Sequence, residues 1–264
     1  MNNPAKWAIA IVVLIAVAAF VYYQWFREEA VPQPPPPAPI ETKPVPETKP
    51  APKIQYPIEE PAREKPLPTL GESDPAIREA LEGLFGRIAF AKYFYLDEII
   101  RRIVVTVDNL PRQKVSQRLM PVKPVAGKFL VTGAEEHAVI NPANYARYKP
   151  YVELAETVNV KKLVAVYVHF YPLFQQAYRD LGYPNGYFND RLIEVIDNLL
   201  AAPDAKGPVK LVQPGVLYQY ADPNLEALSA GQKIMLRMGA ENAARIKTKL
   251  KEYRHELTRE ELKQ

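Results

Sequence analysis

The sequence predicts a mainly α-helical domain with a minor β-hairpin, preceded by one transmembrane helix and a proline-rich linker. Three observations lead to this fold class. Residues 7–26 carry no charge, residues 27–68 are rich in proline, and residues 69–264 repeat their apolar positions at helical spacing. The last region holds 196 residues, which is long enough to bury one sizeable core.

The uncharged segment 7–26 is 20 residues long. At about 1.5 Å per residue, a helix of this length crosses the ~30 Å hydrocarbon layer of a bilayer. A cleaved signal peptide is the alternative, because small residues occur between Ala16 and Ala19, but the apolar run continues into bulky aromatic residues beyond them. We expect an uncleaved anchor in the bacterial inner membrane, with residues 1–6 cytoplasmic and the carboxy-terminal domain in the periplasm. Lys6 and Arg27 flank the span and do not decide its orientation.

The linker 27–68 is defined by proline: between Pro32 and Pro68, 14 of 37 residues are proline. Proline fixes φ and removes the N–H donor, so we expect a disordered spacer with polyproline II character. At about 3.1 Å per residue it would reach roughly 115 Å. A docking strip for aromatic grooves is the alternative. Over these first 68 residues the layout resembles that of TonB-type energy transducers.

The first half of the domain contains two predicted helices and a hairpin. Ser73-Asp74-Pro75 is a typical helix start, with a capping side chain before proline, so a helix is expected from there to about Leu84. Apolar spacing predicts a second helix from Asp97 to about Asn109, which Pro111 ends. Two short apolar stretches around a polar turn, within residues 129–140, predict the hairpin.

Helical signals dominate the second half. A short helix is expected after Asn141-Pro142, and a longer one runs from an Asn159 cap to Gly182, kinked or split at Pro172. An apolar stripe predicts a helix over 192–200, and Val209–Tyr220 is expected to be extended. Ser229-Ala230-Gly231-Gln232 fits a capping box that opens the last helices.

Several longer phrases resemble the domain of unknown function 3014 family, a group of uncharacterised proteobacterial envelope proteins. These phrases occupy residues 104–112, 171–178 and 187–191, with 231–233 and 237–239 in a carboxy-terminal block. The resemblance spans about residues 67–257. It implies an envelope protein behind an amino-terminal anchor, and it implies no activity and no catalytic residues.

The charge distribution suggests one candidate binding surface. The chain has a formal net charge of +4, but between Ile99 and Ala134 seven basic residues accompany one acid, Asp108. A basic surface attracts an acidic partner, an anionic lipid headgroup or an acidic glycan. Nucleic acid is not expected as a partner of an exported domain. The basic residues are Arg101, Arg102, Arg112, Lys114, Arg118, Lys123 and Lys128.

Aromatic residues suggest a second candidate surface, because eight of the 16 tyrosines fall between Tyr145 and Tyr187. Tyrosines suit sugar or peptide recognition, and they are equally good core residues. The candidate groove residues are Tyr171, Tyr178, Tyr183, Tyr187 and Phe188.

Catalytic signals are weak. Asp190 and Glu194 lie four residues apart on a predicted helix, and paired carboxylates can act as acid and base in glycan cleavage. The chain has no cysteine and three dispersed histidines, so the sequence predicts no thiolate chemistry, no metal site and no cofactor.

The expected function is therefore a membrane-anchored periplasmic binding or scaffold module of the cell envelope, whose partner is an envelope protein, an anionic lipid or a cell-wall glycan. A glycan hydrolase using Asp190 or Glu194 is one alternative. A transmembrane signalling or transport accessory protein is another.

Overall fold

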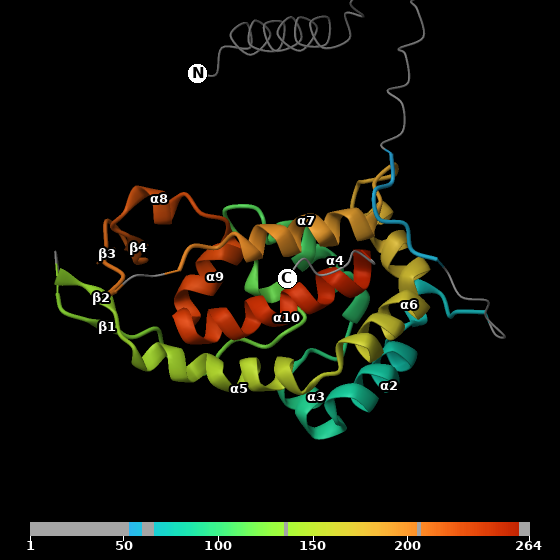
Figure 1. The fold of residues 1–264 in the computed structure, drawn as a ribbon. Helices are drawn as coiled ribbons and strands as arrows, with labels where there is room; N and C mark the ends of the chain where they lie inside the picture. The colour runs from blue at the N-terminus through green and yellow to red at the C-terminus, as the bar shows by residue number, and fades with distance from the viewer. Residues whose placement is uncertain (1–52, 60–65, 135–136, 205–206, 259–264) are drawn as a thin grey trace, which may run out of the picture. The chain divides into compact units, whose positions relative to one another are not determined.

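The computed structural model describes residues 53–59, 66–134, 137–204 and 207–258 (Figure 1). The predicted anchor, 7–26, lies outside these residues. Among the helices of the described ranges, none combines the length and the apolar character that a membrane span requires.

The amino-terminal part of the domain contains three α-helices. After a 3₁₀ turn (η1, Leu70–Glu72) come α2 (Asp74–Phe85), α3 (Arg87–Tyr93) and α4 (Ile99–Asn109). Gly86, with φ of 80°, separates α2 from α3, a short helix that the sequence did not predict.

The cap predicted for the first helix is wrong. The Ser73 hydroxyl donates to the carbonyl of Leu70 (2.8 Å) and makes no cap hydrogen bond to α2. Asp74 instead accepts the backbone N–H groups of Glu98 (2.7 Å) and Ile99 (2.9 Å), so it caps the start of α4 across space. This contact joins two helices and is invisible to a local sequence pattern.

Three longer helices follow, separated by short connections: α5 (Ala143–Thr157), α6 (Val160–Asp180) and α7 (Phe188–Leu200). The predicted Asn159 cap is confirmed, because its side chain accepts from the Lys162 N–H at 3.0 Å. The predicted split at Pro172 is absent, and α6 is one continuous helix. The residues on either side of Pro172 are buried, so tertiary packing holds the helix together where the proline removes a hydrogen bond.

The carboxy-terminal part contains α8 (Pro223–Glu226), α9 (Ala230–Met238) and α10 (Ala240–Thr258). The predicted capping box is confirmed. Ser229 Oγ accepts the Gln232 N–H (3.1 Å), and Gln232 Oε1 accepts the Ser229 N–H (3.3 Å).

Two small antiparallel hairpins complete the described part of the fold. The predicted one pairs β1 (Val131–Thr132) with β2 (Val139–Ile140). The other pairs β3 (Leu211–Val212) with β4 (Gln219–Tyr220), where the sequence predicted one extended stretch. The chain reverses in the intervening loop, which contains Pro214 and Gly215, residues typical of turns.

The described residues therefore form a mainly helical domain, as predicted, with two hairpins rather than one. Its largest apolar cluster lies between α2, α4, α6 and α7 and includes Ile100, Val104, Phe174 and Phe188. Helix α10 lies between α5 and α7 (Figure 1) and is linked to α5 by Arg245 Nε and Glu156 Oε1 at 2.8 Å. The hairpins lie at the end of the domain away from α2 and α3 (Figure 1).

Gly231 tests the junction between α9 and α4. Its N–H donates to the Leu110 carbonyl (2.9 Å), and a Cβ would lie 3.2 Å from that oxygen and 2.5 Å from Leu199 Cδ2. We expect Gly231→Ala to lower the free energy of unfolding by about 1–3 kcal/mol in urea titrations, because the junction has no room for a methyl group. The matched control is Gly83→Ala in α2, where a Cβ meets no atom within 4 Å, and it should raise stability by about 0.5–1 kcal/mol. If both variants stabilised the domain equally, the result would contradict the close packing described around Gly231.

Candidate functional site

The start of α7 is positioned by a glutamine of α6. The Gln175 side chain accepts the Phe188 N–H (2.8 Å) through Oε1 and donates to the Gly186 carbonyl (2.8 Å) through Nε2. The Tyr171 hydroxyl donates to the same Oε1 at 3.0 Å. Because Phe188 is also buried in the core, the first turn of α7 is fixed and its remaining side chains point along defined directions.

A segment without helix or strand, residues 53–58, lies against this turn, and we call it the strap. By composition the strap belongs to the proline-rich linker. In the structure it instead forms part of the surface of the domain. Side chains of α7 and of the residue before it bind its main chain through four hydrogen bonds: Gln55 N to Asp190 Oδ2 (2.9 Å), Tyr56 N to Asp190 Oδ1 (2.8 Å), Ile58 N to Tyr187 Oη (2.7 Å) and Asn189 Nδ2 to Tyr56 O (2.9 Å). These side chains recognise peptide groups rather than particular residue types.

A buried carboxylate lies next to the strap. The Asp108 side chain, on α4, is only 4% exposed. Its Oδ2 is 2.6 Å from Arg112 Nη2 and accepts the Tyr183 hydroxyl at 3.2 Å, and its Oδ1 is 3.3 Å from Arg191 Nη2. Two guanidinium groups and a hydroxyl therefore compensate the buried charge.

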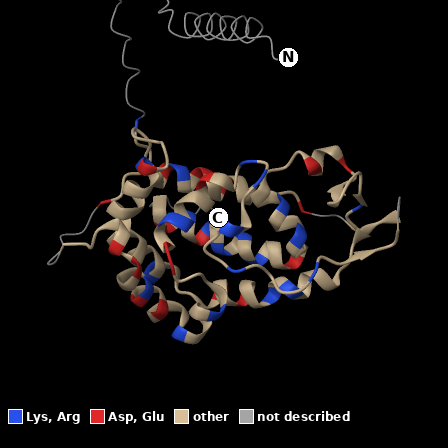
Figure 2. Cartoon of the chain, turned by 180° about the vertical axis from the view of Figure 1, so that it is seen from behind, with Lys and Arg blue, Asp and Glu red and all other residues tan. Residues whose placement is uncertain are grey.

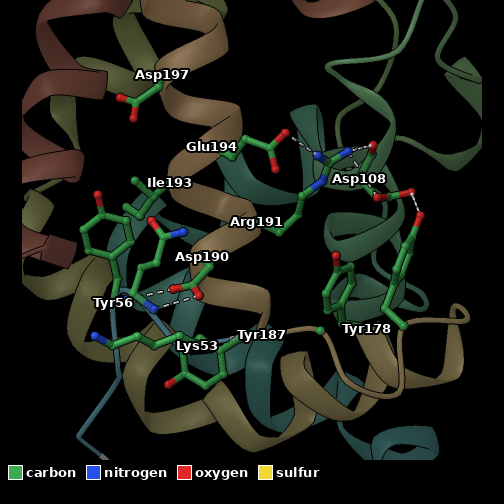
Figure 3. Close-up of a pocket in the computed structure, with 13 residues that line it drawn as sticks. Lys53, Tyr56, Asp108, Tyr178, Tyr187, Asp190, Arg191, Ile193, Glu194 and Asp197 are labelled. Carbon is green, nitrogen blue, oxygen red and sulfur yellow. Dashed lines mark hydrogen bonds and ion pairs between the residues drawn. The ribbon is translucent and has the colours of Figure 1, made fainter. Parts of the chain in front are cut away.

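Arg191 connects this carboxylate to the open side of α7. Its Nη2 donates to the Asp108 carbonyl (2.8 Å), and its Nη1 is 2.8 Å from Glu194 Oε1 (Figure 3). Burial acts to lower the pKa of the Arg191 guanidinium, but the hydrogen bond to Glu194 and the charges of Glu194 and Asp108 outweigh it, so the pKa is raised.

Together these groups surround a cleft of about 630 Å³, which we call the strap cleft. The strap forms one wall, and Asp190, Glu194 and Asp197 lie along α7 on another (Figure 3). Four carboxylates line the cleft together with one lysine and one arginine, and a second arginine, Arg112, pairs with Asp108 from outside the lining. Asp197 is paired with Arg254 of α10, Nε to Oδ1 at 2.7 Å.

The five predicted aromatic residues divide between core and cleft. Tyr171, Tyr178 and Phe188 are buried in the main apolar cluster. Tyr183 and Tyr187 are half-buried and line the strap cleft, where Tyr178 also contributes an edge. Burial raises the pKa of the Tyr171 and Tyr178 hydroxyls, so both remain protonated hydrogen-bond donors at neutral pH.

The two carboxylates proposed from the sequence for catalysis, Asp190 and Glu194, both reach the strap cleft. Both oxygens of Asp190 accept main-chain N–H groups of the strap, and the Glu194 side chain, 63% exposed, is paired with Arg191. These contacts hold a peptide and a guanidinium. Glycan cleavage by this pair stays a prediction.

The predicted basic patch is spread over several environments. Arg101 is 3.6 Å from Asp180, Arg102 is 2.8 Å from Asp97, and Arg112 reaches Asp108. Lys123 Nζ donates to the Ala91 carbonyl at 2.7 Å. The other three, Lys114, Arg118 and Lys128, are exposed, and their side chains make no ion pair or hydrogen bond with the described residues.

Sequence reasoning missed the strap and the role of Asp108. Asp108 is the only acid among the basic residues of segment 99–134, and this isolation was the available signal for a buried, compensated charge. The strap had no comparable signal, because its partners lie more than 120 residues away in the chain.

The described residues contain no group of three or more His, Asp or Glu side chains placed to hold a metal ion.

The stretches quoted above for the resemblance converge at this site, since residues 104–112, 171–178 and 187–191 supply Asp108, Gln175 and the first turn of α7. A family model described as "Protein of unknown function (DUF3014)" matches residues 99–254. The chain belongs to this family. The comparison with the curated proteins and the comparison with the solved structures found no match to this chain.

The buried cluster generates a stability prediction. Asp108→Asn removes the buried carboxylate that both Arg112 and Arg191 contact, so we expect it to lower the free energy of unfolding by about 3–5 kcal/mol in urea. The matched control is Arg112→Gln, whose side chain is 53% exposed, and it should cost less than about 1 kcal/mol. If the two variants lowered the free energy of unfolding by similar amounts, the result would contradict the claim that burial of Asp108 determines the cost.

Proposed function

We propose that this chain is a membrane-anchored binding module of the cell envelope, in which the helical domain binds an extended segment of an envelope protein at the strap cleft. Residues 7–26 form the anchor in the inner membrane, and residues 27–52 form the free part of the spacer. The domain lies in the periplasm and acts by binding rather than by catalysis.

The observation that carries the proposal is the mode in which the strap is bound. Tyr187, Asn189 and Asp190 form hydrogen bonds with its main-chain groups at 2.7–2.9 Å, while the side chains of Tyr56 and Ile58 pack on apolar clusters of the domain. A surface that binds the main chain of an extended segment accepts many sequences and favours peptide ligands. The partner segment would lie beside the strap, along the open remainder of the cleft.

The side chains along the open part of the strap cleft favour a partner segment with basic side chains. Glu194 and Asp197 are 63% and 47% exposed on the open side of α7, and the cleft has more carboxylates than cations. Tyr183 and Tyr187 add flat surfaces with hydroxyl groups, which suit peptide contacts.

The position of the strap also supports a tethered module. The spacer reaches the domain at α7, next to the cleft, and not at η1, where the described chain resumes at residue 66. A pull along the spacer therefore acts first on the cleft wall. The predicted anchor and the proline-rich composition of the spacer also support a tethered module.

Photo-crosslinking of the full chain in cells tests this proposal. A photoreactive residue at Glu194 should capture a discrete envelope protein, and mass spectrometry should place the adduct in an extended segment that contains Lys or Arg. The matched control position is Ile88 on α3, which is 86% exposed and remote from the cleft residues in sequence, and it should not capture this protein.

Capture of the same products from both positions would contradict a specific site. Glycan or lipid adducts at Glu194 without any protein would contradict the partner class.

A further inference from the structure

The loop between β3 and β4 and the segment just before β1 expose apolar side chains. In the loop between β3 and β4, Val216 is 91% exposed and Leu217 is 78% exposed. Phe129, just before β1, is 38% exposed, and its ring centroid lies 6.4 Å from that of Tyr218. The two hairpins thus form one surface, which we call the hairpin tip, and few charged residues mark this end of the domain (Figure 2).

A second cleft, of about 560 Å³, opens beside the hairpin tip. Its lining includes the apolar tip residues, two arginines and no acidic side chain among the described residues. The lining of the strap cleft differs in this respect, because it includes four carboxylates. Glu135 and Glu136, in the turn between β1 and β2, lie outside the described residues.

The two arginines differ in their partners. Arg147 is held by carbonyl groups, with Nε 2.8 Å from Ala126 O and Nη2 2.7 Å from Gly127 O. Arg237 lies 6.0 Å from the Tyr220 ring centroid and has no carboxylate partner among the described residues. The carboxylate of Glu226 is paired with Lys233, at 2.7 Å, and not with Arg237. Arg237 is therefore available to an anion.

We propose that the hairpin tip docks on an anionic phospholipid bilayer. Val216 and Leu217 enter the boundary of the acyl chains, and Arg237, supported by Arg147, binds headgroup phosphate. Exposed aliphatic residues at a loop tip with cations behind them follow the order of a membrane interface, where the hydrocarbon lies below the phosphates.

The exposed lysines beside the strands agree with this orientation. Lys128 precedes Phe129, and Lys210 precedes Leu211 in β3; neither makes an ion pair among the described residues. A free phosphate would satisfy Arg237 but would leave Val216 and Leu217 in water. An anionic bilayer would bind Arg237 through its phosphates and would also remove Val216 and Leu217 from water, and for this reason we prefer it to a free phosphate.

The absence of cysteine from the chain makes a site-specific test possible. Gly215→Cys places a thiol beside Val216 without removing it, at a position where a Cβ meets no atom within 4 Å. The full chain, labelled there with an environment-sensitive fluorophore, is reconstituted into neutral phosphatidylcholine vesicles. Vesicles containing phosphatidylglycerol are then added as acceptors.

We expect the emission at position 215 to increase and shift to the blue with phosphatidylglycerol acceptors but not with phosphatidylcholine acceptors. The double variant Val216→Ser/Leu217→Ser should weaken the apparent vesicle affinity roughly tenfold or more. Arg237→Gln should weaken it about fivefold. A label at Ile88→Cys should not respond in either case.

The matched controls are Ile88→Ser and Arg87→Gln on α3, whose side chains are also highly exposed and which should leave the affinity unchanged. No response at position 215, an equal response to neutral acceptors, or full affinity in the double variant would each overturn the proposal. Reconstitution relies on the proposed anchor, and alkaline extraction of the donor vesicles tests the anchor separately. If the chain is extracted, the anchor fails, and the response at position 215 is still read with the released chain.

Discussion

A buried carboxylate constrains the centre of this domain. Asp108 lies on a helix whose other buried residues are largely apolar, and an uncompensated charge there would cost several kcal/mol. Its compensation comes from three parts of the chain: Arg112 at the end of α4, Tyr183 in the connection after α6, and Arg191 on α7. These partners must therefore stay together whenever the domain is folded.

The same turn of α7 that satisfies Asp108 also holds the strap. Asp190 and Arg191 are consecutive, and they point to different partners, the strap on one side and α4 on the other. Because Gln175 fixes the start of this turn, the end of the spacer is joined to the rigid core through very few side chains.

The sequence predicted features that depend on neighbours within a few residues. The Asn159 cap and the capping box at Ser229 are local, and both are present. The predicted Ser73 cap is absent because the Ser73 hydroxyl donates to the Leu70 carbonyl. Pro172 did not divide α6 because core packing on both sides holds the helix.

For the candidate site, the prediction was uneven for the same reason. The aromatic residues and the carboxylates Asp190 and Glu194 were identified by type. The strap residue that Asp190 holds lies 134 positions away in the chain, whereas Glu194 pairs with Arg191 on its own helix. The strap has the composition of a proline-rich spacer. It docks through main-chain hydrogen bonds and through only two apolar side chains, Tyr56 and Ile58, which are too few to form a pattern in the sequence. For β3 and β4 the sequence predicted one extended stretch, and the turn residues Pro214 and Gly215 between the two strands were not read as a chain reversal.

The central claim is that the first turn of α7 clamps the end of the spacer through Asp190. Amide hydrogen exchange of the full chain, resolved by mass spectrometry, tests it directly at Gln55 and Tyr56. We predict that these amides are protected, that Asp190→Asn removes much of this protection, and that Asp180→Asn, which alters a surface pair at 3.6 Å, does not. Exchange of both amides at the rate of an unstructured peptide in the unmodified chain would contradict the claim.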